Sequence, residues 1–588
     1  MAKQDTQHTS LGSELEAAKN ALREQRETWD EKERLLLGRR TDKLSDSRKS
    51  QVTDASIGTL QWDRAARVVA QIPTGTSQAA SKKDVGKNAL MNIALTRHII
   101  PNANSQYDHL TKLRVAKAYA GAWGAVPMMY DYRIDDEYVG PDSWIINIRD
   151  FFPEPNKLTI NDCNWVMIST TSTVGYLEDK LKKEGWDKAN IRKIIDEAKE
   201  GKKPSKKDDP NRTGKDSSLL KTDTASKGKH AEIELITKFE RGKKGRWVTF
   251  APDYENLVIR DIKNPHKNGK IPVVLLQNFP RIDSIIGLSD IERGSTLQKA
   301  KDSLINLYLD GVKMSIFKPL KINPTGVKMS SIRNSAGSKW LMDDTSKVQE
   351  HNVSPQGINS FVGTYQFLDS ALLNLNGTTN TTVASDQGSV TQGKTPAAIK
   401  SQQARENARD NWDRFMMEKF IEELYEGFIN LMCEKQEKPV PIDLFETEID
   451  QLIAAGMDDV AEVYESGKAG KLILKKSDIK SKYRYLIDAG STMAKDDSEE
   501  LEALMQSFNL FSQVPAEILA SGGRQWDVSE HLKKILIKSG IQDWEKILPE
   551  VGTDEDPQQQ IDPFATLDQN DAAVNQLIEQ TLGGVNVQ

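Results

Sequence analysis

Eight residues in the second half of the chain match the pattern of a nucleotide-binding loop. Gly388, Gly393, Lys394 and Thr395 occupy the fixed positions of G-x-x-x-x-G-K-T. In such a loop, backbone N–H groups surround the phosphates, the lysine contacts the terminal phosphates and the Thr hydroxyl binds Mg²⁺. The pattern therefore raises one enzymatic hypothesis, that the chain is a P-loop ATPase.

The surrounding sequence supplies only half of the context that this loop needs. Thr395 is a good helix N-cap and Pro396 suits the first helical position, so a helix is expected to follow. The preceding residues 382–387 are polar and could not form the buried parallel strand that delivers a P-loop. The best acidic partner for a metal is Asp488, in a pattern common to ordinary strands. We keep ATPase activity as an alternative and favour a polar loop closed by a helix cap.

No other motif has catalytic or metal-binding spacing. None of the seven histidines pairs with a His or Cys at the spacing of metal ligands. The acidic pairs at 135–136 and 343–344 are interpreted as solvated turn residues, because the chain has 86 acidic residues. Cys163 and Cys433 are predicted to be reduced structural thiols. We therefore expect no catalytic residue, metal or cofactor, which favours a structural or mechanical role.

Composition sets further limits. The 588 residues are 28% charged and 37% hydrophobic, with a net charge of −6. No apolar run reaches about 18 residues, so no membrane span is expected. The first residues lack a secretory signal, so synthesis and function are expected to begin in a cytoplasm. The net charge argues against a protein that grips nucleic acid with its whole surface, but not against one that lets nucleic acid pass.

The helices and strands of the first half of the chain are predicted from apolar periodicity. Leu15, Leu22, Trp29 and Leu36 recur every seven residues, which predicts a helix over 11–37 that lays one face on the rest of the protein, in preference to a free coiled coil. Further helices are expected at 59–72, 85–100, 105–125 and 173–185, and strands at 126–132, 144–148, 165–170, 233–239, 247–250, 257–262 and 273–278.

The centre of the chain has a different order. A helix at 290–317 is followed by short strand-and-turn material at 320–353, a helix at 357–375, the polar loop at 376–395 and a helix at 396–434 that would be about 58 Å long. Beyond it we expect a short helix near 445–465, a strand at 483–487 and helices near 495–513, 527–539 and 541–548. The predicted fold class is α+β and predominantly helical.

This order resembles that of the portal (head-to-tail connector) protein of tailed bacteriophages, over roughly residues 105–550. The motifs that carry the resemblance are Gly287-Leu288-Ser289-Asp290 with Leu297-Gln298, Gly393-Lys394-Thr395-Pro396-Ala397-Ala398, and Asp488-Ala489-Gly490-Ser491. Pro396 stands where many relatives lack a proline.

The resemblance implies a portal fold of wing, stem helices, clip, channel loop and crown. It divides the chain into an N-terminal helical region (1–104), a wing (105–286) with an exposed insertion (200–230), a first stem helix (287–319), a clip (320–354), a second stem helix (355–375), a channel loop (376–395), a long wing helix and wing strand (396–492), crown-like helices (493–550) and a polar tail (551–588).

The resemblance also implies a function. Portal proteins form rings, usually of twelve subunits, at one vertex of the capsid, and double-stranded DNA enters and leaves through the axis. By this resemblance the partners are the major capsid protein and scaffold, the terminase large subunit, and head-completion or tail adaptor proteins. The expected location is the virion, with assembly in the host cytoplasm. A virion assembly protein without a channel stays a second alternative.

Within the channel loop, the candidate DNA contacts are Asn380, Thr382, Gln387 and Lys394. Amides and hydroxyls make weak, sequence-independent contacts to phosphates. Each lysine that neutralises a phosphate adds salt-dependent affinity and hence friction. Lys394 is the one basic candidate in the loop, and a solvated residue beside a helix start is its alternative role.

Overall fold

A computed structural model of the chain falls into two units, residues 1–494 and 495–588, which are described separately. The structure describes residues 2–39, 49–81, 84–134, 138–199, 231–316, 320–323, 325, 327–332, 341–350, 358–376, 396–437, 440–443, 452–453, 471–488, 504–510, 528, 531–532 and 535–536. The predicted insertion at 200–230, the helix near 541–548 and the tail at 551–588 lie outside these residues, as does most of the predicted helices near 445–465, 495–513 and 527–539.

Two helices stand where the heptad pattern predicted one. They are α1 (Ala2–Ala21) and α2 (Arg23–Leu36), separated at Leu22, whose φ of −103° and ψ of 5° leave the helical region. The four heptad residues Leu15, Leu22, Trp29 and Leu36 are nevertheless all buried. The expectation that this segment packs on the rest of the protein is confirmed.

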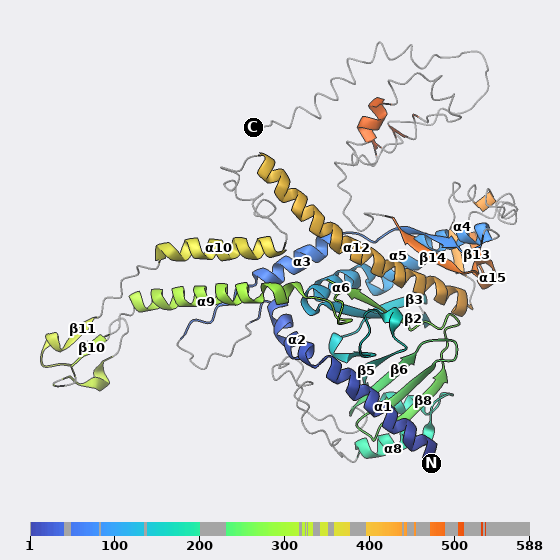
Figure 1. The fold of residues 1–588 in the computed structure, drawn as a ribbon, viewed down its shortest axis with the longest axis horizontal. Helices are drawn as coiled ribbons and strands as arrows, with labels where there is room; N and C mark the ends of the chain where they lie inside the picture. Colours follow the sequence, from blue (N-terminus) through green and yellow to red (C-terminus); the bar gives the residue numbers. More distant parts are fainter. Residues whose placement is uncertain are drawn as a thin grey trace, which may run out of the picture. The chain divides into compact units, whose positions relative to one another are not determined.

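The larger sheet has five antiparallel strands in the order β4-β5-β6-β7-β8. They span Phe151–Pro153, Trp165–Thr173, Glu232–Glu240, Arg246–Ala251 and Leu257–Lys263. Side chains alternate across the sheet: on β6, Ile236 packs in the same cluster as Leu11 and Leu15 of α1, whereas Ile233 and Leu235 pack in the cluster that holds α7 (Val174–Lys180) and α8 (Lys188–Lys199). The sheet is thus covered on both faces (Figure 1).

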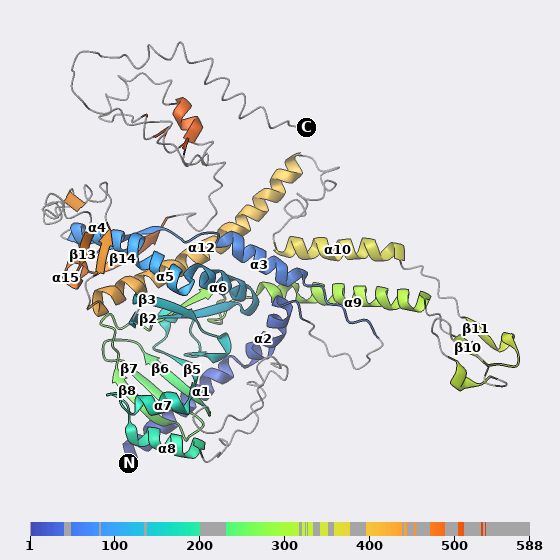
Figure 2. The same ribbon diagram turned by 180° about the vertical axis from the view of Figure 1, so that it is seen from behind.

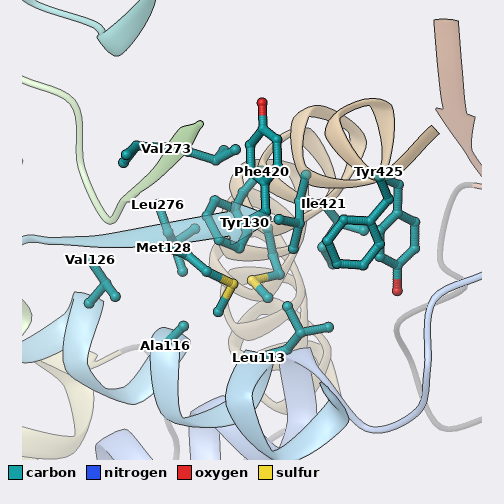
Figure 3. Packing of buried hydrophobic residues seen from close by; sticks show 14 of the residues in the cluster. Leu113, Ala116, Val126, Met128, Tyr130, Val273, Leu276, Phe420, Ile421 and Tyr425 are labelled. Atoms are coloured by element: carbon teal, nitrogen blue, oxygen red, sulfur yellow. The ribbon is translucent and has the colours of Figure 1, made fainter. Parts of the chain in front are cut away.

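The smaller sheet is built from β3 (Val139–Ile145), β2 (Ala125–Ile134) and β9 (Val273–Gln277). It shares a core with α6 (His109–Trp123) and with the long helix α12 (Pro396–Lys435). Figure 3 shows residues from α6, β2, β9 and α12 in one cluster: Leu113, Ala116, Val126, Met128, Tyr130, Val273, Leu276, Phe420, Ile421 and Tyr425. This core holds the second half of α12 against the sheet.

The helical predictions before the smaller sheet differ from the structure in detail. The predicted helix at 59–72 is α3 (Ser56–Val68). The predicted helix at 85–100 is α4 (Val85–Ala94), a π-helical turn (Leu95–Ile99) and α5 (Ile100–Tyr107). The predicted start at 105 was wrong, because Asp108 adopts a left-handed φ of 50° and α6 begins after it.

Gly124 ends α6. Its φ is 90°, and a Cβ there would lie 2.1 Å from the carbonyl oxygen of Gly287. Both the backbone conformation and the close approach of another segment therefore require glycine at this position.

Two strand pairs join distant parts of the chain and were not predicted. β1 (Gly75–Ala79) pairs with β14 (Tyr483–Ile487), and β12 (Val440–Asp443) pairs with β13 (Lys471–Leu474), next to the short helix α15 (Lys476–Ile479). Of these strands only β14 was expected. The first pair ties the N-terminal region to the end of the first unit.

Both cysteines are unpaired, as expected. The Cys163 thiol donates to the Thr159 carbonyl at 3.4 Å, and the Cys433 thiol donates to the Ile479 carbonyl at 3.2 Å. Burial raises the pKa of each thiol to about 11, so both are held in the unreactive thiol form. Within the described ranges, no helix combines the length and apolarity needed to cross a membrane, and no cluster of side chains has the makeup of a metal site.

We predict that His109 makes the folded state acid-sensitive. Burial, reinforced by the charge of Lys112, lowers the pKa of His109 to about 3, against about 6.5 in an unfolded chain. Because the unfolded chain binds a proton that the folded chain does not, stability falls by about 1.4 kcal/mol per pH unit as the pH drops from 6.5 towards 3. Urea midpoints measured across this range should show a shallower loss in His109→Gln than in the original chain. Equal slopes would contradict the prediction.

Candidate functional site

Two helices lie side by side where the sequence predicted the stem pair (Figures 1 and 2). They are α9 (Asp290–Ile316) and α10 (Ile358–Asn376), within one residue of the predicted bounds. Between them in sequence, β10 (Leu320–Ile322) pairs antiparallel with β11 (Val348–Glu350). The predicted strand-and-turn material is therefore a small β-hairpin-like unit that connects the two helices.

The residues before α9 fix where it begins. Ser289 caps the helix, since its hydroxyl accepts from the Glu292 N–H at 3.1 Å. The same hydroxyl lies 2.5 Å from the Ala122 carbonyl oxygen at the end of α6. A Cβ on Gly287 would lie 2.5 Å from the Phe279 carbonyl oxygen, so only glycine fits. The Gly-Leu-Ser-Asp motif thus anchors α9 to the core.

A buried cluster of charges holds the first turn of α9. Arg64 of α3 lies 3.2 Å from Asp290 and also pairs with Asp413 of α12, and Lys117 of α6 lies 3.1 Å from Asp413. Asn278 donates to Asp290 at 3.0 Å and accepts from Lys117 at 3.0 Å. All four charged side chains are at most 4% exposed. Two acids and two bases therefore tie four helices together with no net charge.

A second ionic centre lies further along α9, at Lys301. Its ammonium is 2.6 Å from Asp54 and 2.6 Å from Asp369 of α10, and it lies 4.6 Å from the ring of Tyr365. Burial acts to lower the pKa of Lys301, but its hydrogen bonds to Asp369 and Asp54 hold that pKa above its ordinary value. Burial acts to raise the pKa of Asp54, but hydrogen bonds from Lys301 and Ser56 hold it below its ordinary value. Lys301 thus joins α9, α10 and the segment before α3.

Apolar contacts complete the pair. The rings of Tyr308 and Phe361 stack at 4.1 Å with an interplanar angle of 17°. A Cβ on Gly294 would lie 2.6 Å from Ile57 and 3.3 Å from Leu372, so glycine there permits the helices to approach. These aromatic residues of α9 and α10 therefore pack against each other within the protomer.

The outer surface of the pair is partly apolar. Leu307 is 71% exposed on α9, and Phe367 is 70% exposed on α10. The one charged residue of α10 is Asp369, which Lys301 engages. Among the described residues of α10, those that are exposed are all uncharged: Ser360, Val362, Gly363, Thr364, Gln366, Phe367 and Asn374. The exposed residues of α10 are therefore apolar or neutral polar, whereas α9 also exposes charged residues such as Arg293 and Lys313.

The predicted DNA contacts lie outside the described residues. Asn380, Thr382, Gln387 and Lys394, with the whole Gly388–Thr395 match, fall in residues 377–395. The structure does describe both flanks, since α10 ends at Asn376 and α12 begins at Pro396.

The acidic partner proposed for the ATPase alternative, Asp488, does not follow a parallel strand. Asp488 follows β14, which pairs antiparallel with β1, and its carboxylate accepts from the Thr74 hydroxyl at 3.1 Å. Every strand pair among the described residues is antiparallel, whereas a P-loop lies at the end of a buried parallel strand.

Comparison with known families identifies the kind of protein. The model of the family described as phage SU10 portal protein matches residues 40–451, which is more than two thirds of the chain. The chain belongs to this portal protein family. A search of curated proteins found no match. Membership makes the protein a structural component of the phage virion, oligomeric and located at a capsid vertex. The match covers the whole of α9, α10 and α12.

Sequence reasoning missed the residues that hold this portal protein's helix pair in place. Arg64, Lys117 and Asp413 are single charged residues in amphipathic helices, where charges usually face water. Asp54 lies in a short polar stretch before a helix. No local pattern distinguishes these residues from their solvated neighbours, since their partners are 226 to 349 residues away.

We predict that Lys301→Met weakens the helix pair, because it leaves Asp54 and Asp369 facing each other without their cation. Removing one member of a buried ion pair costs about 3 kcal/mol. The matched control is Lys299→Met, since Lys299 is 41% exposed and pairs with Glu31 at the surface, where such a pair is worth about 0–1 kcal/mol. The measurement is the urea midpoint followed by tryptophan fluorescence. Similar shifts in both variants would contradict a special role for Lys301.

Proposed function

We propose that this portal protein assembles into a ring whose axis is the channel for double-stranded DNA during packaging and ejection. The observation that carries the proposal is the order of elements within the family match: α9, the β10–β11 unit, α10, residues 377–395 and the 40-residue helix α12. In this assignment α9 and α10 are the stem helices and β10–β11 belongs to the clip. Residues 377–395 are the channel loop.

The chemistry of α10 and the loop supports a passage rather than a binding site. A channel for DNA must not hold the phosphates, because each neutralised phosphate adds affinity that must be broken for the duplex to move. The one charged residue of α10, Asp369, pairs with Lys301. The loop carries one acid, Asp386, and one base, Lys394. Asn380, Thr382 and Gln387 then offer weak phosphate contacts that do not depend on sequence.

The exposed apolar side chains support packing between subunits. Leu307 and Phe367 project from the helix pair with about 70% of their surface exposed. A ring places two different faces of each subunit in contact, so each helix pair has a neighbour on both sides. We expect twelve subunits, as the family resemblance implies, with these side chains buried between neighbours.

The proposed partners follow the same assignment. The β10–β11 unit, as part of a clip, would receive the terminase large subunit during packaging and the head-completion or tail adaptor proteins afterwards. The major capsid protein and scaffold would contact the wing, residues 105–286, during assembly in the host cytoplasm. The crown-like helices are assigned to 493–550.

The ATPase alternative rests on the Gly388–Thr395 match alone. The antiparallel pairing of the described strands and the family match both favour a structural role. A virion assembly protein without a channel shares the composition, but it does not require a loop between a helix pair and a long helix.

Deleting residues 378–391 is expected to leave folding and ring formation intact, because the deletion lies between two helices and removes none of their residues. DNA packaging or retention should fall, since the channel loop is gone. Packaging is measured as DNase-protected genome length in particles that carry the variant. Normal packaging would remove the assignment of this loop.

Lys394→Ala serves as the matched point variant. We expect it to assemble normally and to package DNA with altered salt dependence. Loss of ring formation would mean that Lys394 has a structural role. ATP hydrolysis by the purified protein, abolished by the same substitution, would support the ATPase alternative.

Glutamate at Leu307 or Phe367 is expected to block ring formation without unfolding the subunit, because a charge would be buried between neighbours. The control is Ile282→Glu, in a side chain that is 94% exposed outside the helix pair. Analytical ultracentrifugation separates rings from single subunits. Rings formed equally by all three variants would place the interface elsewhere.

A further inference from the structure

Residues 49–56, called the strap below, run along α9 and end at the first residue of α3 (Figure 2). Three backbone N–H groups of the strap donate to three side chains of the helix. Ser50 donates to Asp310 at 2.8 Å, Val52 to Asn306 at 2.8 Å and Asp54 to Asp302 at 2.9 Å. Alternate residues of the strap thus meet every fourth residue of the helix.

This match of spacings has a geometric basis. Two residues of an extended chain span about 6.6 Å, and four residues of an α-helix rise about 6 Å. Gln298 continues the series by one turn, since its amide accepts from the Ile57 N–H at 3.3 Å and donates to the Asp54 carbonyl at 2.6 Å. Gln298, Asp302, Asn306 and Asp310 therefore form a ladder on one face of α9 that binds the main chain of an extended segment.

Apart from these hydrogen bonds, the strap is held chiefly by the side chains of Asp54 and Ser56 at its end. The side chains of Gln51 and Val52 are exposed. Each hydrogen bond contributes about 1 kcal/mol net, and a segment attached mainly by backbone hydrogen bonds with few buried apolar groups belongs to the least stable part of a fold. The strap can therefore detach while the sheets and their core stay folded.

The strap also completes the Lys301 centre. Asp54 supplies one of the two carboxylates on Lys301 and accepts from the Tyr365 hydroxyl of α10 at 3.2 Å. The Ser56 hydroxyl lies 2.8 Å from the Lys301 ammonium. Detachment of the strap would remove Asp54 from both Lys301 and the Tyr365 hydroxyl, and would leave Asp369 and Tyr365 as the ties of α10 to Lys301. The position of α10 thus depends on a segment about 310 residues earlier in the chain.

We propose that the strap is a releasable latch that fixes α10 against α9 and so sets where residues 377–395 begin. Docked, it locks the helix pair through Asp54. Released, it removes the Asp54 contacts and leaves α10 held to α9 by Asp369 and the Tyr308–Phe361 stack, so α10 is held less firmly while the sheets stay folded. The consequence for the channel loop rests on the proposed function, but the latch itself rests only on the contacts of the strap, α9 and α10.

Val52→Pro tests the latch, because proline removes the N–H that Asn306 accepts and tolerates an extended backbone. Gln51→Pro is the matched control, since the alternation of an extended chain turns its N–H away from the ladder. Hydrogen exchange is followed by mass spectrometry in 49–56, in α10 and in β5–β6 as internal reference. Loss of about 1 kcal/mol should speed exchange about fivefold in the strap, and by the same factor in α10 if one opening frees both.

Asn306→Ala provides a second test, with Ser303→Ala as its control at an exposed position one turn away on α9. Tyr365→Phe removes the direct tie between α10 and the strap and should speed exchange in α10 alone. Faster exchange in the strap with unchanged exchange in α10 would overturn the proposal, as would equal effects of Val52→Pro and Gln51→Pro. Neither result would bear on the DNA channel, because rings and DNA are not measured.

Discussion

The helix pair depends on a buried group of charges at one end. Arg64, Lys117, Asp290 and Asp413 come from four helices and neutralise one another out of contact with water. A buried cluster of this kind adds little net stability compared with apolar packing, but removing any member leaves an uncompensated charge and is strongly unfavourable. The cluster therefore fixes which helices meet and at what point along their length. The first turn of α9 and the middle of α12 take their positions from it.

From this fixed end, contacts of decreasing strength follow α9 outward. Lys301 holds α10 and Asp54 through ion pairs, and the Tyr308–Phe361 stack lies one to two turns beyond. The ladder binds residues 49–56 through backbone hydrogen bonds alone. Near the last turns of α9, exposed apolar side chains replace internal partners. Buried charges hold the base of the helix pair, whereas its surface carries exposed apolar side chains. This arrangement suits an element whose surface packs against neighbouring copies.

Much of the fold was predictable where local signals are strong. The long helices α9, α10 and α12 and the strands β2 and β5 to β9 were located because apolar periodicity and flanking Pro and Gly mark them, whereas β3 was predicted at 144–148 and spans Val139–Ile145. The single N-terminal helix and the helix start at 105 were wrong, since Leu22 and Asp108 depart from helical geometry without a proline or glycine to announce it. The pairing of β1 with β14, the charge cluster and the strap were not predictable, because each joins residues far apart in sequence. The loop candidates Asn380, Thr382, Gln387 and Lys394 stay predictions.

The most direct test of the account is electron microscopy of the purified full-length protein, with class averages viewed down the symmetry axis and a reconstruction that locates α10. The account predicts a ring with an axial hole wide enough for duplex DNA, with α10 and residues 377–395 at the wall of that hole. A ring without such a hole, or one with α10 on its outer rim, would contradict the assignment of the channel.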